Sequence, residues 1–320
     1  MKKLFGKKRT VASVLVVMIL ILLLTQSQTI SWEGVLRSLK AIGGQSFFLA
    51  LCVAIAQYVS VALRFVVLMS KTSVTPFQCS RIFTNGQLFN HVFPARAGDL
   101  YKVIALKRSS PDKSFSTAYV VSALIIERLV STLVLVLLIV FLVDWSTLRI
   151  ADLSFVGRTQ QLTIVVSVAA LAGVALYFMQ KKFPRLHAWM AELKRSFFTI
   201  LNVRTFILVV CMSIVMWVLE VWSIKFLAIP LGVDLQLGQG LFVLLLLNVG
   251  IAVPVTLGNV GTYEAALVLG LGLWGAGSND GIAIAVSHHF LQILSLVILA
   301  GIFNTINLKM SQQKIAAGSE

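Results

Sequence analysis

Long apolar runs separated by short polar segments set the pattern of this 320-residue chain. A helix needs about 20 apolar residues to cross the roughly 30 Å hydrocarbon core of a bilayer. Six runs approach or exceed that length, and they cover residues 10–26, 46–70, 115–143, 161–179, 205–229 and 281–305. The pattern therefore predicts an all-α, polytopic helical membrane protein with about six full spans, formed by a single integral membrane domain over residues 1–320.

Two further apolar regions, 82–108 and 239–275, are interrupted by polar residues. Each interruption contains a Pro-x-x-x-Gly motif, Pro94–Gly98 in the first region and Pro254–Gly258 in the second, where Gly261 follows closely. Proline lacks a backbone donor and glycine tolerates a positive φ, so each motif can reverse the direction of the chain. We expect two re-entrant, broken-helix hairpins; for the second region, a pair of short crossings is the alternative.

The order of these elements repeats along the chain. Residues 1–144 and residues 160–308 each give span, span, hairpin, span, and the two halves begin on opposite sides of the membrane. An offset of 160 residues places Pro94 opposite Pro254, Gly98 opposite Gly258 and Asp99 opposite Asn259. Inverted repeats with broken helices that meet near the midplane are typical of many transporters. The sequence therefore predicts an inverted repeat.

Composition excludes an ordinary soluble protein. Hydrophobic residues make up 58% of the chain and charged residues 12%, whereas soluble domains carry about 25% charge. The net charge of +15 reflects Lys and Arg residues, twenty of which lie in 2–9, 71–113, 181–204 and 309–314, against four in the opposite loops. Cytoplasmic loops collect such cations. We expect a multi-pass protein of the plasma (bacterial inner) membrane with both termini cytoplasmic, and no nucleic-acid partner.

Few charged residues fall within the predicted spans, where each costs roughly 2.5–3.5 kcal/mol to insert. Glu127 and Arg128 lie near the middle of one span. An internal ion pair and a direct role in ligand binding are both open for them, and the two roles can coexist. Arg64 and Lys225 lie closer to span ends, so we expect their long side chains to reach the interface.

Polar residues also accompany both hairpin motifs. In the first, Arg96, Asp99 and Lys102 cluster around the turn. The planar guanidinium of Arg and the compact ammonium of Lys both suit a phosphate; simple exposure to cytoplasmic water is the alternative. In the second, Asn259 and Glu264 introduce polar groups where a span would have none. We take these five, with Glu127 and Arg128, as candidate binding residues for an anionic lipid headgroup.

The sequence contains no recognisable catalytic or cofactor motif. It has no Ser-His-Asp order, HExxH motif or P-loop, and its His and Cys residues lack the spacing of metal ligands. We therefore expect no metal, no cofactor and no enzymatic activity.

Three stretches resemble the lysylphosphatidylglycerol synthase transmembrane region family, a flippase-like domain: NHVFPARAGDLYK at Asn90–Lys102, ERL at Glu127–Leu129 and PVTLGNVGTYE at Pro254–Glu264. The resemblance assigns to the family's motifs Pro94, Arg96, Gly98 and Asp99, then Glu127 and Arg128, then Pro254, Gly258, Gly261 and Glu264. This chain departs from the pattern at Lys102 and at Ser131, where an Arg and an acidic residue are usual, and at His288–His289, where the last span commonly holds an Arg. Aminoacylation of lipid is not expected, since the synthase's soluble transferase domain is not seen in this sequence.

The first hypothesis is a lipid translocase that moves a polar headgroup, expected to be anionic, between the hairpins while the tails remain in lipid. A membrane-embedded enzyme acting on a lipid-linked substrate, with Glu127 or Asp99 as base, is an alternative. A non-catalytic partner subunit of a membrane glycosyltransferase is another, so a glycosyltransferase or a lipid-modifying enzyme is an expected partner.

Overall fold

The computed structural model describes residues 31–93, 97–110, 115–143, 184–252 and 257–317 of the chain. Over these ranges every regular element is a helix, which confirms the predicted all-α class. The longer helices are α2 (Trp32–Leu68), α5 (Thr117–Leu142), α8 (Val203–Ala228) and α11 (Ser278–Ala317). The shorter ones are α3 (Pro76–Val92), α4 (Ala97–Ser109), α7 (Pro184–Ile200), η3 (Ile229–Leu231), α9 (Leu237–Ala252), η4 (Leu257–Asn259) and α10 (Thr262–Gly272).

Four helices in the described part of the chain are long and apolar enough to cross a membrane, and they cover Trp32–Leu68, Thr117–Leu142, Val203–Leu231 and Ser278–Gln313. They correspond to the predicted spans at 46–70, 115–143, 205–229 and 281–305. The other two predicted spans, 10–26 and 161–179, lie outside the described residues.

Helix α2 begins earlier than its predicted span. The Ser31 side chain accepts a hydrogen bond from the backbone N–H of Gly34 at 3.0 Å and so caps the helix. Gly43, at φ 68° and ψ 161°, interrupts the helical backbone, so the residues before it form a separate segment. That segment carries Arg37 and Lys40, which end the apolar run without preventing a helix. Apolar length alone therefore missed this segment.

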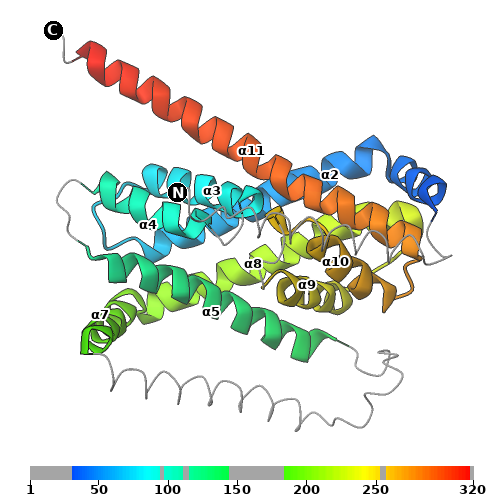
Figure 1. Ribbon diagram of the computed structural model, residues 1–320, viewed down its shortest axis with the longest axis horizontal. Coiled ribbons are helices and arrows are strands. Elements are labelled where there is room, and N and C mark those ends of the chain that lie inside the picture. The colour runs from blue at the N-terminus through cyan, green and yellow to red at the C-terminus, as the bar shows by residue number, and fades with distance from the viewer. Residues whose placement is uncertain (1–30, 94–96, 111–114, 144–183, 253–256, 318–320) are drawn as a thin grey trace, which may run out of the picture.

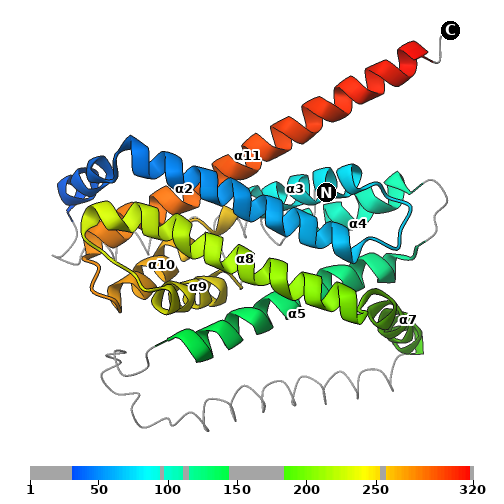
Figure 2. The same ribbon diagram turned by 180° about the vertical axis from the view of Figure 1, so that it is seen from behind.

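The four long helices form the body of the protein, and α2 and α8 pack side by side on the face that is nearest the viewer in Figure 2 (Figures 1 and 2). Helix α11 packs on α2, α3 and α8, while α5 packs on α8 and α9. The short helix α7 packs against α5. The C-terminal part of α11 extends beyond the body in both views.

The two interrupted regions form two pairs of packed helices, α3 with α4 and α9 with α10. Close approach in the first pair depends on Gly98, where a Cβ atom would collide with the carbonyl oxygen of Gly86. Its backbone is helical within α4. The expected role of Gly98 in a positive-φ turn is therefore wrong: it is needed because two helix backbones approach closely.

The second interruption lies against the end of α3. Gly258 has a φ of 60°, and a Cβ atom there would lie 2.6 Å from the carbonyl oxygen of His91 at the end of α3. Gly261 also has a positive φ, of 86°. At these two positions the expected use of glycine for a turn is confirmed. Pro94 and Pro254 lie outside the described residues.

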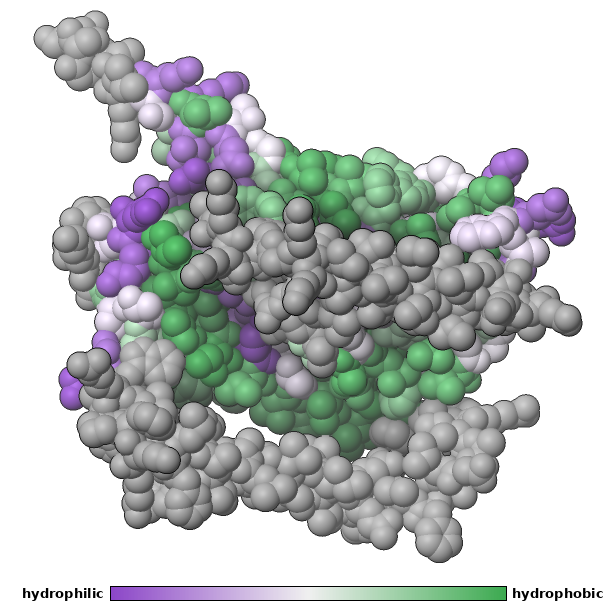
Figure 3. All heavy atoms as spheres, in the orientation of Figure 1, coloured by the Kyte–Doolittle hydropathy of each residue, from purple (hydrophilic) through white to green (hydrophobic). Residues whose placement is uncertain are grey.

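Apolar side chains cover the middle of the body, while polar side chains gather mainly at its ends (Figure 3). A small polar area interrupts the apolar surface near its middle in this view. An apolar band of this kind matches a hydrocarbon environment.

The Gly86–Gly98 contact gives a prediction about stability. Gly98→Ala should lower the melting temperature of the detergent-solubilised protein by several degrees, since overpacking typically costs about 1–3 kcal/mol. Gly301→Ala is the matched control: it also lies in a helix, but an added Cβ meets nothing within 4 Å. The control should melt unchanged or slightly higher because Ala favours helix. Equal melting of Gly98→Ala and the wild type would contradict the predicted contact.

Candidate functional site

A buried ion pair joins three of the long helices. The Arg64 guanidinium on α2 donates to the Glu127 carboxylate on α5 at 2.5 Å, and its other terminal nitrogen donates to the Ser213 hydroxyl on α8 at 2.8 Å. Arg64 is 1% exposed and Glu127 is 4% exposed. The expectation that Arg64 reaches the interface is therefore wrong. Lys225, by contrast, reaches the exposed Asp234 carboxylate at 3.4 Å.

A second charged centre lies at the α3–α4 pair. The Lys102 ammonium is fully buried and donates to the Asp99 carboxylate at 3.0 Å and to the Gln87 side-chain oxygen at 2.8 Å. It also lies 4.4 Å from the centroid of the Phe83 ring. Asn90 donates to the same oxygen of Asp99 at 3.0 Å. These contacts satisfy Lys102 within the protein and fix α4 against α3.

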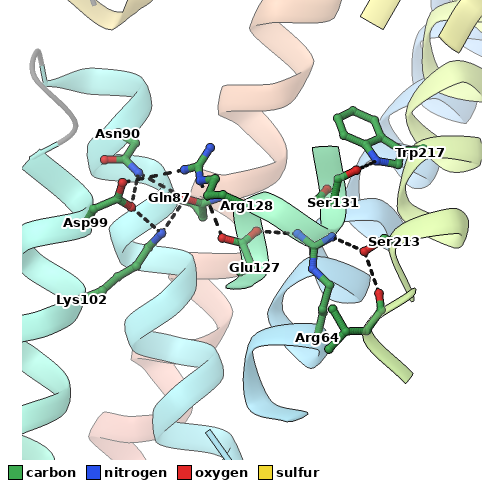
Figure 4. Close-up of polar contacts among 11 residues, drawn as sticks. Arg64, Gln87, Asn90, Asp99, Lys102, Glu127, Arg128, Ser131, Ser213 and Trp217 are labelled. Carbon is green, nitrogen blue, oxygen red and sulfur yellow. Dashed lines mark hydrogen bonds and ion pairs between the residues drawn. The ribbon is translucent and has the colours of Figure 1, made fainter. Parts of the chain in front are cut away.

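Arg128 lies between the two centres (Figure 4). Its guanidinium is 3.9 Å from the Asp99 carboxylate and 3.7 Å from the Glu127 carboxylate. Both distances are longer than a hydrogen bond, and the Arg128 side chain is 45% exposed. We call Arg64, Asp99, Lys102, Glu127 and Arg128 the charged cluster. It contains three cations and two carboxylates, so its formal net charge is +1.

A cavity of about 160 Å³ lies beside the charged cluster. Arg64, Glu127 and Arg128 line one part of it. Its other polar lining residues come from helices in both halves of the chain, and they are Gln57, Tyr58, Gln87, His91, Ser131, Thr132, Glu220, Asn248, Tyr263 and Gln292. We call this space the central cavity. Its lining can offer both donors and acceptors to a polar guest.

A second, open depression of about 420 Å³ lies between α4 and α5. Its walls are apolar except for Asp99 and Arg128, and we call it the α4–α5 groove. Arg128 lines both the groove and the central cavity. The guanidinium therefore stands where an apolar surface depression adjoins a polar interior.

The second interruption is held by Glu264. One carboxylate oxygen accepts from the backbone N–H of Gly261 at 2.6 Å and so caps α10. The other oxygen lies 2.6 Å from Nδ1 of His289 on α11. The ring of Tyr263 stacks on His289 with centroids 4.1 Å apart, and its hydroxyl lies 2.8 Å from Nδ1 of His288. Glu264 thus ties the second interruption to the last long helix.

The structure divides the predicted site residues into groups. Glu127 and Arg128 line the central cavity, and Asp99 and Arg128 line the groove. Neither Lys102 nor Glu264 lines either space, because both are held by protein partners. Asn259 adopts a positive φ of 59° in the second interruption. Arg96 lies outside the described residues, as do Pro94 and Pro254.

Sequence reasoning missed several residues that line the cavity. Gln57, seven residues before Arg64, points to a polar stripe on one face of α2, because residues seven apart share a helix face. Glu220, for which the sequence suggests an internal partner, also lines the cavity. Its position inside an apolar span was the available signal.

These features define the class of protein. It is a multi-pass helical membrane protein with a charged, polar interior beside an open apolar groove. The chain belongs to the family described as lysylphosphatidylglycerol synthase TM region, whose model matches residues 10–300. This match confirms the resemblance found in the sequence motifs. Comparison with curated proteins gave no match. A role connected with membrane lipid fits the family.

The buried Arg64–Glu127 pair gives a prediction about stability. Arg64→Met should destabilise the detergent-solubilised protein by about 3–5 kcal/mol, because it leaves a buried carboxylate with only the longer Arg128 contact. The double variant Arg64→Met/Glu127→Leu should recover most of the lost melting temperature. Lys225→Met, which breaks a partly exposed pair, should cost no more than about 1 kcal/mol. A double variant as unstable as Arg64→Met would contradict the pairing.

Proposed function

We propose that the protein is a lipid translocase that moves an anionic lipid headgroup through the central cavity while the hydrocarbon tails stay in the bilayer. One observation carries the proposal: Arg128 lines both the cavity and the groove, and its guanidinium lies beyond hydrogen-bond distance of both carboxylates of the charged cluster. A charge in an apolar environment needs a partner. An anionic headgroup that enters beside Arg128 supplies one.

A phosphate suits this position better than a carboxylate side chain would. The guanidinium presents a planar fork of N–H donors that binds two oxygens of a phosphate at once. The 3.7 and 3.9 Å distances to Glu127 and Asp99 leave these donors without a hydrogen bond to either carboxylate. The amide and hydroxyl groups around the cavity can take the uncharged part of a headgroup.

The pattern of helix contacts supports the predicted inverted repeat. Under that repeat α2, α3, α4 and α5 correspond to α8, α9, α10 and α11. The contacts α2–α3, α3–α4, α4–α5 and α2–α5 then have the counterparts α8–α9, α9–α10, α10–α11 and α8–α11. Likewise α2–α11 and α3–α11 correspond to α8–α5 and α9–α5, and all of these pairs are in contact.

We further propose that α3–α4 and α9–α10 are re-entrant hairpins that enter the membrane from opposite sides. The contact of Gly258 with His91 supports this, since two such hairpins would meet near the midplane. Lys107 and Arg108 end α4 and would lie at the cytoplasmic surface of the plasma membrane. Both chain termini would then be cytoplasmic.

The test is transport by the purified protein in liposomes of phosphatidylglycerol and phosphatidylethanolamine. A fluorescent phosphatidylglycerol should become accessible to a membrane-impermeant quencher faster than in protein-free liposomes. Arg128→Ala should slow this exchange about tenfold, equivalent to about 1.4 kcal/mol, because the headgroup loses its counter-charge. Arg128→Lys should retain part of the rate, since it keeps the charge without the fork.

Lys225→Ala is the matched control, because it removes a cation from a long helix at a position away from the central cavity. Its rate should equal the wild-type rate. Equal exchange by Arg128→Ala and the wild type would refute the assignment of Arg128. A change in the mass of the lipid after incubation would instead favour the membrane-embedded enzyme. A co-purifying glycosyltransferase, with no exchange by the chain alone, would favour the partner subunit.

A further inference from the structure

The α4–α5 groove has the character of a site for a hydrocarbon chain. Apolar side chains form its walls: Leu100 and Val103 on α4, and Val121, Leu124, Ile125 and Leu129 on α5. Three of them are well exposed, at 59% for Leu100, 39% for Ile125 and 58% for Leu129. Exposed apolar residues are ordinary on a lipid-facing surface, but here they line a depression rather than a smooth face.

The polar end of the groove distinguishes it from ordinary lipid-facing surface. Arg128 and Asp99 lie there, and the Arg128 side chain is 45% exposed, with its guanidinium 3.9 Å from the Asp99 carboxylate. Asp99 already accepts from Lys102 and Asn90, both at 3.0 Å, so its charge is engaged within the protein. The groove therefore offers a hydrocarbon surface that ends at a cation, which complements an anionic lipid.

We infer that the α4–α5 groove binds one acyl chain of an anionic glycerophospholipid whose phosphate pairs with Arg128. This inference deepens the proposed translocase and rests on it for the path that the headgroup then takes. The groove holds the tail outside the body, and the central cavity receives the headgroup on the other side of the same guanidinium. Arg128 thus marks the boundary between the acyl chain, which stays at the bilayer side, and the headgroup, which enters the protein.

The direction of the bound chain follows from the order of the wall residues. Val121 precedes Arg128 by seven residues on α5, which is about 10 Å along a helix axis. The groove therefore runs from the phosphate position toward the connection between α4 and α5. That end carries Lys107 and Arg108 and is cytoplasmic under the proposed topology. Under that topology the bound chain lies in the cytoplasmic half of the hydrocarbon core, with its phosphate near the middle of α5.

Photo-crosslinking tests the site directly and without transport. The full-length protein is reconstituted with phosphatidylglycerol that carries a diazirine either next to the glycerol or at mid-chain, and the labelled residues are mapped by mass spectrometry. The first probe should label Ile125 and Leu129, and the second should label Val103 and Val121. The reverse order would overturn the inferred direction, and labels spread evenly over α5 and α11 would overturn the site.

A matched pair of substitutions separates the groove from the general lipid surface. Ile125→Trp fills the groove and should lower labelling of its walls about tenfold, equivalent to about 1.4 kcal/mol. Leu133→Trp lies on the same helix, is 52% exposed and lies outside the groove, so labelling should be unchanged. Both variants must melt as the wild type does. Equal labelling in both, or crosslinks between two copies of the chain in place of lipid, would refute the inference.

A change at the cation tests the choice of lipid. Wild-type protein should be labelled more by the phosphatidylglycerol probe than by a phosphatidylcholine probe, and Arg128→Ala should remove that difference. Equal labelling of the wild type by both probes would refute the preference for a net anionic headgroup. If the groove is labelled as expected but liposome exchange fails, the binding site stands and the translocase proposal falls. If exchange occurs without labelling of the groove, the translocase stands and this site falls.

Discussion

The requirement that every charge in an apolar body find a partner organises this protein. Removing ions from water costs several kcal/mol each unless close partners replace the solvent. Arg64 and Glu127 meet this requirement across α2 and α5, with Ser213 adding α8. Asp99 and Lys102 meet it at the α3–α4 pair. Because these contacts are satisfied only when the helices stand in one arrangement, they specify how α3–α4, α5, α2 and α8 are placed around the central cavity.

The same requirement applies to backbone groups where helices are interrupted. Within a bilayer, interrupted backbone is tolerated only where protein or a water-filled cavity surrounds it. The Gly261 N–H is satisfied by Glu264, which is itself held by His289 on α11. Gly258 lies against the carbonyl of His91 at the end of α3. The second interruption is thereby supported by α11 and by the end of α3, so the backbone there can be irregular while remaining packed.

Apolar length was enough to predict the four long helices that the structure describes, apart from the segment of α2 before Gly43. The Pro-x-x-x-Gly motifs were enough to predict two interrupted helix pairs. The partner of Glu127 was not predictable in this way. Sequence position placed Arg64 near a span end, but its burial depends on which face of α2 meets α5 and α8. Periodicity is a weak guide here because a lipid-facing surface is as apolar as a packed core. The gathering of Gln57, Glu220 and Gln292 around one cavity likewise depends on tertiary packing.

The residues at which this chain departs from its family pattern have different roles in the structure. Lys102 replaces the usual Arg, yet its ammonium is enclosed by Phe83, Gln87 and Asp99 and lines neither cavity nor groove. The Lys102 departure therefore affects helix packing and not the lining of either space. His288 differs, because its two ring nitrogens contact the hydroxyl of Tyr263 and the amide of Gln292, both of which line the cavity. An Arg in this region would add a fixed charge beside the polar wall, whereas the His288 imidazole contacts two hydrogen-bonding groups. Ser131 lines the cavity directly and His288 contacts two of its lining residues, so these two departures lie where they affect the polar wall of the cavity.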